Sequence, residues 1–346
     1  MIFHKTLIHW YLQYKRDLPW RKTTNPYYVW LSEIMLQQTR VAQGLPYYLK
    51  FIEAFPTVHD LANANESFVL KLWQGLGYYS RARNLHYTAK YISNDLKGIF
   101  PDNFSDLKKL KGVGDYTASA IASICFNEST AVVDGNVYRV LSRYFGIATP
   151  INITKGIKEF KALAQSLIDD KQPGMYNQAI MDFGATLCKP QNPLCNECPF
   201  AQSCLALANN TISSLPVKEK KTKVKKRYFN YLVLKSPNNT TILQERTSRG
   251  IWQGLYQFPL IETLKEVKDS KVIEDHSVFK SLFNKEASLV LYNIEPVVHK
   301  LSHQHLYTNF WIVNTENASG QEVAVSDLEK YPVPVLIANF LNQFFY

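Results

Sequence analysis

Hydrophobic residues in the first 208 positions recur three and four apart, which is the spacing of amphipathic helices. Residues 57–75 show this pattern with Thr57 as the capping residue, and residues 80–98 end on a glycine typical of a helix stop. Strand-like alternation is nearly absent, so the pattern predicts an all-α domain over residues 1–208. Further helices are predicted over residues 1–20, 117–126, 135–147, 158–169 and 176–188.

A different pattern follows a polar, basic and non-periodic stretch, residues 209–227, which is predicted to be an interdomain linker. Residues 227–234 and 241–246 flank a Pro-Asn-Asn turn and predict a β-hairpin. More strands are predicted over residues 287–294 and 305–313, and a closing helix over 332–345. We therefore expect an α+β domain over residues 228–346.

Length and charge extend this picture. A chain of 346 residues with 46% hydrophobic residues is long enough for two packed domains. Lysine and arginine outnumber acidic residues 22 to 16 in residues 1–208 and 7 to 1 in the linker, whereas the second domain has 10 against 12. This basic first half and linker predict a nucleic-acid partner, although a solvated charge run explains the linker equally well. Apolar runs are too short for a membrane span, so no membrane partner is expected.

Four cysteines crowd into 17 residues of a chain that has only one other cysteine, Cys125. The opening segment lacks a secretory cleavage site, which predicts a reducing compartment and argues against disulfides. Thiolates gathered this closely suit an iron–sulfur cluster or zinc. A zinc ribbon usually shows two C-x2-C pairs and this run has one, so an iron–sulfur cluster is favoured. The four are Cys188, Cys195, Cys198 and Cys204.

Residues 110–121, LKGVGDYTASAI, place a Gly-Val-Gly hairpin between two helical segments. Gly112 and Gly114, on either side of Val113, permit positive φ and close backbone approach. Backbone N–H groups at the start of the next helix can hold a phosphate oxygen without reading sequence. The segment predicts a helix-hairpin-helix motif over about residues 106–124, with an ordinary tight turn as the alternative.

Two carboxylates lie in contexts that suit acid–base chemistry. Glu33 has apolar neighbours on most sides, and desolvation there would raise its pKa and make it a general acid. Asp134 follows an apolar run and precedes a helix, where it would serve as an N-cap or as a second catalytic carboxylate. Glycosidic bond hydrolysis needs such a pair. A solvent-facing Glu33 and a purely capping Asp134 are the alternatives.

Residues 75–83, GLGYYSRAR, combine tyrosines with arginines, which suits wedging among bases beside phosphates. The alternative is a turn with core tyrosines. Other motifs along the chain are, in order, WLSEIMLQQT, LKGVGDYTA, VDGNVYRVL, NQAIMDFGATLC, the cysteine run and LSHQHL. Together with residues 75–83, these motifs resemble those of the adenine DNA glycosylase (MutY) family of the helix-hairpin-helix DNA glycosylase superfamily. That family removes adenine mispaired with 8-oxoguanine.

The resemblance implies an all-α helix-hairpin-helix glycosylase domain with a cluster loop over residues 188–204, followed by an α+β MutT-like (Nudix-type) domain. It implies a [4Fe–4S] cluster held by the four cysteines. It also implies a monomeric base excision repair enzyme of the bacterial cytoplasm and nucleoid. Its partner would be double-stranded DNA carrying adenine opposite 8-oxoguanine or guanine.

The resemblance also assigns residues. Glu33 would protonate adenine N7, Asp134 would stabilise the cationic sugar, and Asn136 would support Asp134. Residues matching the adenine pocket are Arg16, Trp20, Arg21, Leu36 and Gln178. Residues matching DNA contacts are Gln37, Gln38, Thr39, Leu76, Tyr78, Gly112, Val113 and Gly114. Ser302 and His303 match the loop that senses the lesion.

Tyr116 stands where endonuclease III-like enzymes carry the lysine that forms a Schiff base. Tyrosine cannot form an imine, so the resemblance implies a monofunctional enzyme with Tyr116 assisting near the sugar. The chain departs from the family at Lys111, often proline, and at Leu301, usually phenylalanine. The second domain lacks an R-E-x-x-E-E run, which argues against nucleotide hydrolysis. Alternatives of other kinds are a pyrimidine glycosylase/lyase and a non-enzymatic, cluster-bearing DNA-binding regulator.

Overall fold

The computed structural model describes residues 3–219, 224–283, 286–315 and 318–346. The chain divides into two compact units. Unit 1 comprises Met1–Asn63 and Asn84–Lys220, and unit 2 comprises Ala64–Arg83 and Lys221–Tyr346. The segment Ala64–Arg83 falls within the predicted domain 1–208 by sequence order but packs in unit 2. Residues 220–223 of the predicted linker lie outside the described residues.

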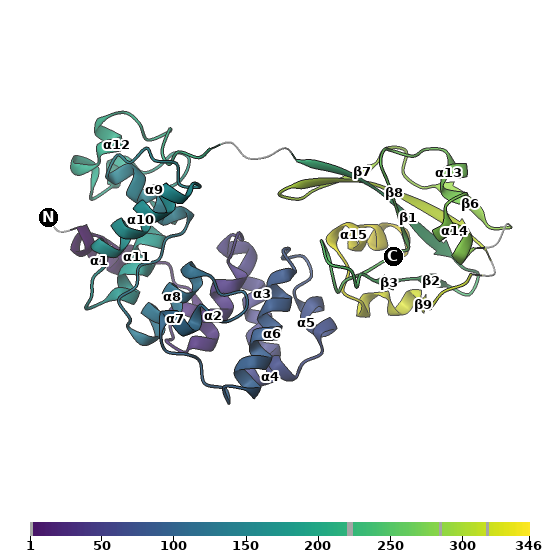
Figure 1. Cartoon of the computed structure of the whole chain (residues 1–346), viewed down its shortest axis with the longest axis horizontal. Helices are drawn as coiled ribbons and strands as arrows, with labels where there is room; N and C mark the ends of the chain where they lie inside the picture. Colours follow the sequence, from purple (N-terminus) through teal and green to yellow (C-terminus); the bar gives the residue numbers. More distant parts are fainter. Residues whose placement is uncertain (1–2, 220–223, 284–285, 316–317) are drawn as a thin grey trace. The chain divides into compact units, whose positions relative to one another are not determined.

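Unit 1 is built from helices (Figure 1), and its described residues contain no strand, which confirms the all-α prediction. Its helices are α1 (Phe3–Tyr14), α2 (Pro26–Met35), α3 (Val41–Ala54), α4 (Val58–Asn63), most of α6 (Ser80–Asn94), α7 (Phe104–Leu107), α8 (Asp115–Phe126), α9 (Gly135–Tyr144), α10 (Thr154–Leu167), α11 (Pro173–Thr186) and α12 (Leu205–Ala208). Three short 3-10 turns join them: η1 (Pro19–Arg21), η2 (Cys195–Glu197) and η3 (Ala201–Ser203).

One of the predicted helices is divided into two helices in the structure. Residues 57–75 form α4 and then α5 (Glu66–Leu72), because Asn65 adopts an extended conformation and begins the second helix. Asparagine favours caps over helix interiors, since its side chain competes for backbone hydrogen bonds. The predicted cap at Thr57 is present, because its Oγ1 accepts from the backbone N of Asp60 at 3.2 Å.

Two groups of helices build the core of unit 1. α1, α9, α10 and α11 pack around fully buried side chains that include Leu7, Phe160 and Ala179. α2 packs against α3 and α8, and α8 in turn contacts α11. The start of α9, the outer faces of α2 and α8, and one side of α11 therefore meet at a common place, where the candidate site lies.

Unit 2 contains a mixed sheet in the order β5–β1–β8–β6, with β7 also paired to β8. Its strands are β1 (Lys225–Lys235), β5 (Leu260–Thr263), β6 (Ser288–Leu291), β7 (Val297–Lys300) and β8 (Gln304–Asn314). β1 and β8 run parallel, with Tyr231 opposite Phe310 and Leu232 opposite Trp311. Such central strands are buried on both faces, which explains the nearly continuous apolar run in β1.

Helices cover both faces of this sheet (Figure 1). On one face, Phe340 of α15 (Val335–Phe344) stacks on Phe310 with ring centres 3.9 Å apart. On the other face, α13 (Ser270–Glu274) and α14 (Ser277–Leu282) supply Ile273 and Phe279 to a core with Trp311. The α+β prediction for the second domain is confirmed.

The prediction that residues 227–234 and 241–246 pair as a β-hairpin is wrong. β2 (Thr240–Ile242) pairs with β9 (Glu322–Ala324) and not with β1. The turn itself exists, because the backbone N of Asn239 donates to the carbonyl of Ser236 at 3.1 Å. β1 pairs with β8 along its whole length on one edge and with β5 over Tyr228–Tyr231 on the other, while β2 pairs with β9. β3 (Gln244–Glu245) pairs with β4 (Tyr256–Gln257).

Among the described residues, no helix is both long and apolar enough to cross a bilayer.

Candidate active site

Glu33 lies on α2, whose start is fixed by Asn25 and Pro26. The Asn25 side chain accepts a hydrogen bond from the backbone N of Tyr27, and proline suits the first helical position. Nearly every residue from Tyr27 to Met35 is buried, and Glu33 itself is 8% exposed. This burial raises the pKa of Glu33 to about 7, since desolvation disfavours the charged carboxylate. The sequence predicted such surroundings for this residue.

Asp134 is the N-cap of α9. Its Oδ1 accepts from the backbone N of Asn136 and of Val137 at 2.8 Å each, and its Oδ2 accepts from Asn136 Nδ2 at 2.8 Å. Burial raises the pKa of Asp134, while these hydrogen bonds oppose the rise because they favour the charged form. The capping role that the sequence allowed is therefore present, and Asn136 supports the carboxylate as expected.

Both carboxylates line one cavity of about 520 Å³. It also contains every residue that the sequence assigned to the adenine pocket, together with Thr39, Tyr116 and Asn136. Further lining residues, which the sequence did not single out, include Met181 and Arg139. The adenine-pocket residues are Arg16, Trp20, Arg21, Leu36 and Gln178. Residues more than 160 positions apart in sequence thus converge on one space.

Tyr116 lies at the start of α8, beside Glu33. Its hydroxyl oxygen lies 3.1 Å from Met181 Sδ, and its hydrogen bond to Glu33 partly opposes the rise in the Glu33 pKa. The negative charge of Asp134 acts in the other direction and contributes to that rise. Burial raises the pKa of Tyr116 well above its ordinary range. The phenol therefore stays neutral and acts as a hydrogen-bond donor.

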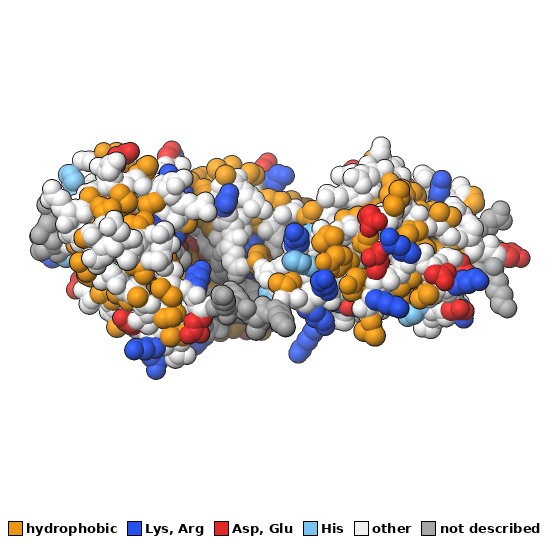
Figure 2. Space-filling view, turned by 90° about the horizontal axis from the view of Figure 1, so that it is seen from above, with side chains coloured by type: hydrophobic (Ala, Val, Ile, Leu, Met, Phe, Trp, Pro, Cys, Tyr) orange, Lys and Arg blue, Asp and Glu red, His pale blue; other side chains and the backbone are white. Residues whose placement is uncertain are grey.

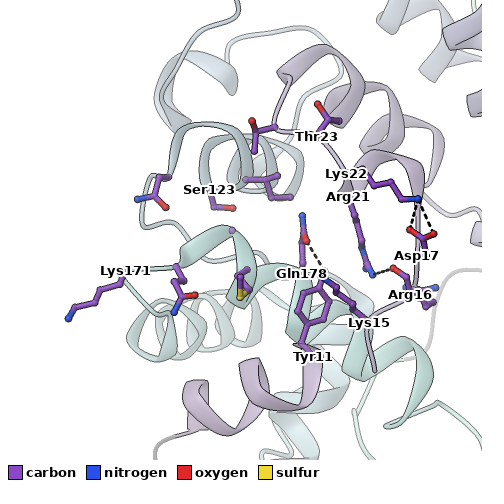
Figure 3. A pocket seen from close by; sticks show the side chains of 16 residues that line it. Tyr11, Lys15, Arg16, Asp17, Arg21, Lys22, Thr23, Ser123, Lys171 and Gln178 are labelled. Atoms are coloured by element: carbon purple, nitrogen blue, oxygen red, sulfur yellow. Dashed lines mark hydrogen bonds and ion pairs between the residues drawn. The ribbon is translucent and has the colours of Figure 1, made fainter. Parts of the chain in front are cut away.

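Figure 3 shows a second cavity, of about 920 Å³. Arg16, Arg21 and Gln178 line both cavities. Gln178 is held by Tyr11, whose hydroxyl donates to Gln178 Oε1 at 2.8 Å. Sequence reasoning missed Tyr11, because an aromatic residue in an amphipathic helix gives no signal of its own beyond a place in the core.

Asp182 was also missed. It is fully buried on α11 and forms ion pairs with Arg16 and Arg21. Burial acts to raise its pKa, but the hydrogen bonds and charges of the two arginines outweigh it, so the pKa lies below its usual value. The available signal was an acidic residue inside the otherwise apolar sequence AIMDFGA.

The hairpin has the predicted positive φ and close approach at Gly112 but not at Gly114, whose φ is −94° and where an added Cβ would meet nothing within 4 Å. Gly112 has φ of +84°, and a Cβ there would lie 2.8 Å from the Cβ of Asn84, so a side chain would be strained and crowded. Val113 is buried as an anchor, whereas Gly114 is exposed and begins the 12-residue α8. Lys111 is exposed, with its Nζ 4.1 Å from the ring centre of Tyr87.

The residues matched to the lesion side of the DNA have different exposures. Gln37 donates from Nε2 to Thr117 Oγ1 at 3.1 Å, whereas Gln38 is exposed with φ of +56°. In unit 2, Leu76 is buried and Tyr78 is 43% exposed with φ of +48°. Tyr78 therefore presents an aromatic ring at the surface, which Leu76 does not.

Ser302 and His303 are exposed in the turn between β7 and β8. The segment Ala64–Arg83 joins this unit through hydrogen bonds. The backbone N of Val333 donates to Gln74 Oε1 at 3.1 Å, and Lys71 Nζ donates to the carbonyl of Tyr331 at 3.3 Å. The segment matched to the DNA wedge and the lesion-sensing turn therefore belong to one unit.

The four cysteines surround one loop after α11, all partly buried. Burial, with a smaller contribution from the other three thiols, raises the pKa of Cys198 to about 11, so the four are electrostatic neighbours. Two arginines of α9 order the loop. Arg139 Nε donates to the carbonyl of Cys188 at 2.7 Å, and Arg143 Nη1 donates to that of Lys189 at 2.8 Å.

Within the described residues, no three His, Cys, Asp or Glu side chains converge as the ligands of a single metal ion do. In a four-iron cluster each thiolate binds a different iron, so its ligands stand farther apart than those around one ion. Four neighbouring thiols form the all-sulfur donor set that an iron–sulfur cluster takes.

The chain matches two known domain families. Residues 31–165 match the HhH-GPD superfamily base excision DNA repair protein, and residues 230–343 match the NUDIX domain. Over 322 residues it is 37% identical to the adenine DNA glycosylase of Buchnera aphidicola subsp. Baizongia pistaciae (strain Bp), covering 90% of this chain and 86% of that protein. The chain belongs to the adenine DNA glycosylase family. This confirms the predicted family, and with it the enzyme class, a hydrolase of N-glycosyl bonds in DNA repair.

The chain is also similar to a mammalian member of this family and to two solved structures of other DNA repair enzymes. The adenine DNA glycosylase of Rattus norvegicus is 46% identical over 226 residues, covering 62% of this chain and 44% of that protein. The solved structure of a thermostable thymine-DNA glycosylase is 31% identical, with a TM-score of 0.56, covering 60% of this chain and 96% of that one. A non-covalent endonuclease III–DNA complex, 21% identical with a TM-score of 0.52 and covering 60% and 96%, shows the shared helical fold alone.

Proposed function

We propose that this member of the family removes adenine mispaired with 8-oxoguanine or guanine from duplex DNA, by hydrolysis of the N-glycosidic bond and without efficient strand cleavage. The observation that carries the proposal is the shared cavity of Glu33 and Asp134. Its volume of about 520 Å³ suits a nucleobase extruded from the duplex. Extrusion costs a few kcal/mol, and less where the pair is already faulty.

Glu33 supplies the proton. With a pKa raised to about 7, a large fraction of this carboxyl is protonated at neutral pH and can still donate efficiently. It protonates the adenine at N7, which turns the base into a better leaving group. The phenol of Tyr116 and the guanidinium of Arg21 limit how far the pKa rises. An ordinary carboxyl would be ionised and unable to donate.

Asp134 stabilises the sugar as the bond breaks. An oxocarbenium-like sugar carries positive charge, and a nearby carboxylate lowers its energy until water attacks. Asn136 holds Oδ2 in place, while the two backbone N–H groups of α9 hold Oδ1. Arg139 Nη2 in turn donates to Asn136 Oδ1 at 2.8 Å, so the amide cannot rotate without losing that bond.

Tyr116 supports the monofunctional assignment. It is the side chain that lies beside Glu33 in the place matched to the lyase lysine, and a phenol forms no Schiff base with an abasic sugar. Lys111 lies on the other side of the hairpin and contacts the ring of Tyr87. Among the described residues that line the cavity there is no lysine. Without an imine, the phosphodiester next to the abasic site stays intact.

Recognition of DNA is divided between the two units. The hairpin at Gly112 and Gly114 would hold backbone phosphates without sequence preference. Unit 2 would recognise 8-oxoguanine through Ser302 and His303. The visible face of the MutT-like domain shows acidic and basic side chains interspersed (Figure 2). Such a mixed surface favours local hydrogen-bonded recognition over general attraction to DNA.

The four cysteines are proposed to hold a [4Fe–4S] cluster. When bound, the cluster would cross-link the loop at Cys188, Cys195, Cys198 and Cys204. Arg139 ties the start of this loop to Gly184 and Asn136 through hydrogen bonds of 2.7 and 2.8 Å. Order in the loop therefore also orders the residues that support Asp134. Redox or signalling chemistry has no support among these contacts.

One experiment tests the proposal. Duplexes carrying A opposite 8-oxoguanine, T opposite 8-oxoguanine, T opposite G, and A opposite T are incubated with excess enzyme, and products are compared with and without alkali. We expect base loss only from the A:8-oxoguanine duplex, with strand breaks only after alkali. Because a thymine-DNA glycosylase shares this fold, the T:G duplex is the decisive alternative. Excision of thymine there, with adenine retained, would replace the proposal.

A further inference from the structure

We propose that Asp182 is a positioning residue for base excision, which holds Arg21 and Arg16 in the wall of the cavity that receives the base. This inference rests on the proposed function, because the cavity is taken to be the base pocket. Asp182 itself does not line the cavity, and its exposed fraction is 0%. It would act on the reaction only through the two arginines.

The contacts of Asp182 fix both guanidinium groups. Its Oδ1 accepts from Arg16 Nε at 2.7 Å and from Arg21 Nη2 at 2.7 Å. Its Oδ2 accepts from the backbone N of Arg16 at 3.2 Å, and each arginine makes one further, shorter contact with the carboxylate. Two forked hydrogen-bond donors around one carboxylate restrict rotation far more than a single contact does.

Arg21 connects this ion pair to the groups proposed to do chemistry. It lines the cavity with Glu33, and its positive charge lowers the pKa of that carboxyl. Its guanidinium also lies 5.6 Å from the ring centre of Tyr11, whose hydroxyl holds Gln178. A displacement of Arg21 would therefore alter both the charge near Glu33 and the packing behind Gln178.

The second cavity lies next to Arg21 and Arg16 and has room for their side chains. Both side chains also line that space of about 920 Å³, with Lys15 and Lys22 nearby (Figure 3). Without the carboxylate, two neighbouring guanidinium groups would repel each other and could gain hydration by turning into that cavity. Desolvating a buried carboxylate is costly, and an apolar residue would avoid that cost. We therefore explain this costly buried carboxylate by its role in holding Arg16 and Arg21.

A double-mutant cycle tests this. Asp182→Asn, Arg21→Gln and the double variant are compared in full-length protein by the single-turnover rate of adenine excision opposite 8-oxoguanine. We expect Asp182→Asn to lower the rate by about tenfold or more while duplex affinity is largely kept, because misplacement affects the chemical step. In the Arg21→Gln background the same substitution should slow excision by clearly less than it does in the unsubstituted enzyme, and the remaining effect acts through Arg16, since residues acting as one unit are not additive.

Two further variants exclude a purely structural role. Asp182→Glu keeps the charge and should recover much of the rate. Tyr27→Phe removes another buried hydrogen bond, to the carbonyl of Phe55, outside the base cavity. It should lower the melting temperature without slowing excision by the folded protein. If Asp182→Asn does not fold, Asp182→Ser carries the same cycle, because it also removes the carboxylate that holds the two guanidinium groups.

Independent, multiplying effects of the Asp182 and Arg21 substitutions would overturn the inference, and so would an unchanged rate in Asp182→Asn. The unsubstituted enzyme is measured alongside to separate the two proposals. If it does not release adenine opposite 8-oxoguanine, the proposed function fails whatever Asp182 does. If it releases adenine and the cycle is additive, only the positioning role fails.

Discussion

The hydroxyl groups of Tyr78 and Ser302 lie 2.6 Å apart, which joins two residues 224 positions apart in sequence. Tyr78 belongs to the segment matched to the DNA wedge, and Ser302 to the turn matched to lesion sensing. Both lie in unit 2, with the segment Ala64–Arg83 packed on the MutT-like domain. The side chain that would enter the duplex and the side chain that would test for 8-oxoguanine thus share one hydrogen bond.

The first prediction follows from that bond. Ser302→Ala and Tyr78→Phe should each reduce the preference for 8-oxoguanine over guanine opposite adenine, by about 1 kcal/mol. The double variant should lose little more than either alone, because one bond is removed in each case. The measurement is the ratio of single-turnover rates on the two duplexes. Ser281→Ala, which removes a hydroxyl elsewhere on the MutT-like domain, should leave the ratio unchanged. Fully additive losses would show that the two side chains act separately.

The second prediction concerns Glu33 and pH. Glu33→Gln should abolish excision while duplex affinity stays within a few-fold, because the amide keeps the shape and loses the acid. In the unsubstituted enzyme the acid must be protonated, so the rate should fall by about tenfold per pH unit once pH exceeds about 7. A rate that stays flat to pH 9 would contradict the acid role.

The same raised pKa has a consequence for stability. Between the ordinary pKa of a glutamate and about 7, the folded protein retains a proton that the unfolded chain has lost, so stability falls as pH rises through this range. Glu33→Gln removes this penalty. The variant should be more stable than the unsubstituted protein above pH 7, by up to about 3 kcal/mol, and should lose that advantage at acid pH. Urea unfolding at pH 5 and pH 8 measures the difference.

The third prediction separates the two roles of Asp134. Asparagine caps helices about as well as aspartate, so Asp134→Asn should keep the stability of α9 and lose excision. Asp134→Ala should lose both, at about 1 kcal/mol of stability. Thermal unfolding and single-turnover kinetics of the two variants give the answer. Near-normal excision by Asp134→Asn would leave Asp134 as a cap only.

The fourth prediction concerns strand cutting. Because Tyr116 cannot form an imine, the abasic product should persist until alkali or heat breaks it. Tyr116→Lys should introduce an adduct that borohydride traps, while Tyr116→Phe should not. Denaturing gels of a labelled strand, run with and without alkali, report the outcome. Efficient cutting by the unsubstituted enzyme, at the rate of base loss, would refute the monofunctional assignment.

The fifth prediction concerns the cysteines. Protein prepared without oxygen should contain about four iron atoms and four acid-labile sulfides per chain. Cys198→Ser should lower this content and the melting temperature, since the loop would lose a cross-link. Ser203→Ala, a loop substitution that removes no thiol, is the matched control. One zinc atom per chain without iron would favour the alternative that the cysteine spacing left open.

Long-range structure decided what the sequence pattern could not. The pairing of β2 with β9 was missed. The division of residues 57–75 into α4 and α5 was also missed, although Asn65 gave a local signal for it. Strand pairing can join distant segments, and β2 pairs with β9 about 80 residues later in the chain. The packing of Ala64–Arg83 in unit 2 was equally invisible, because contacts with Tyr331 and Val333 join segments about 260 residues apart.

The sequence by itself determined the helices of unit 1, the change to an α+β domain, the cap at Thr57 and the hairpin at Gly112, because each depends on neighbours a few positions away. Motif order, read as a family resemblance, also picked out Glu33 and Asp134. Only the tertiary structure decided that these carboxylates share a cavity and that Asp182 stands behind its wall. Burial and ion pairing arise when α1, α2, α8, α9 and α11 pack together, and no local pattern encodes that meeting.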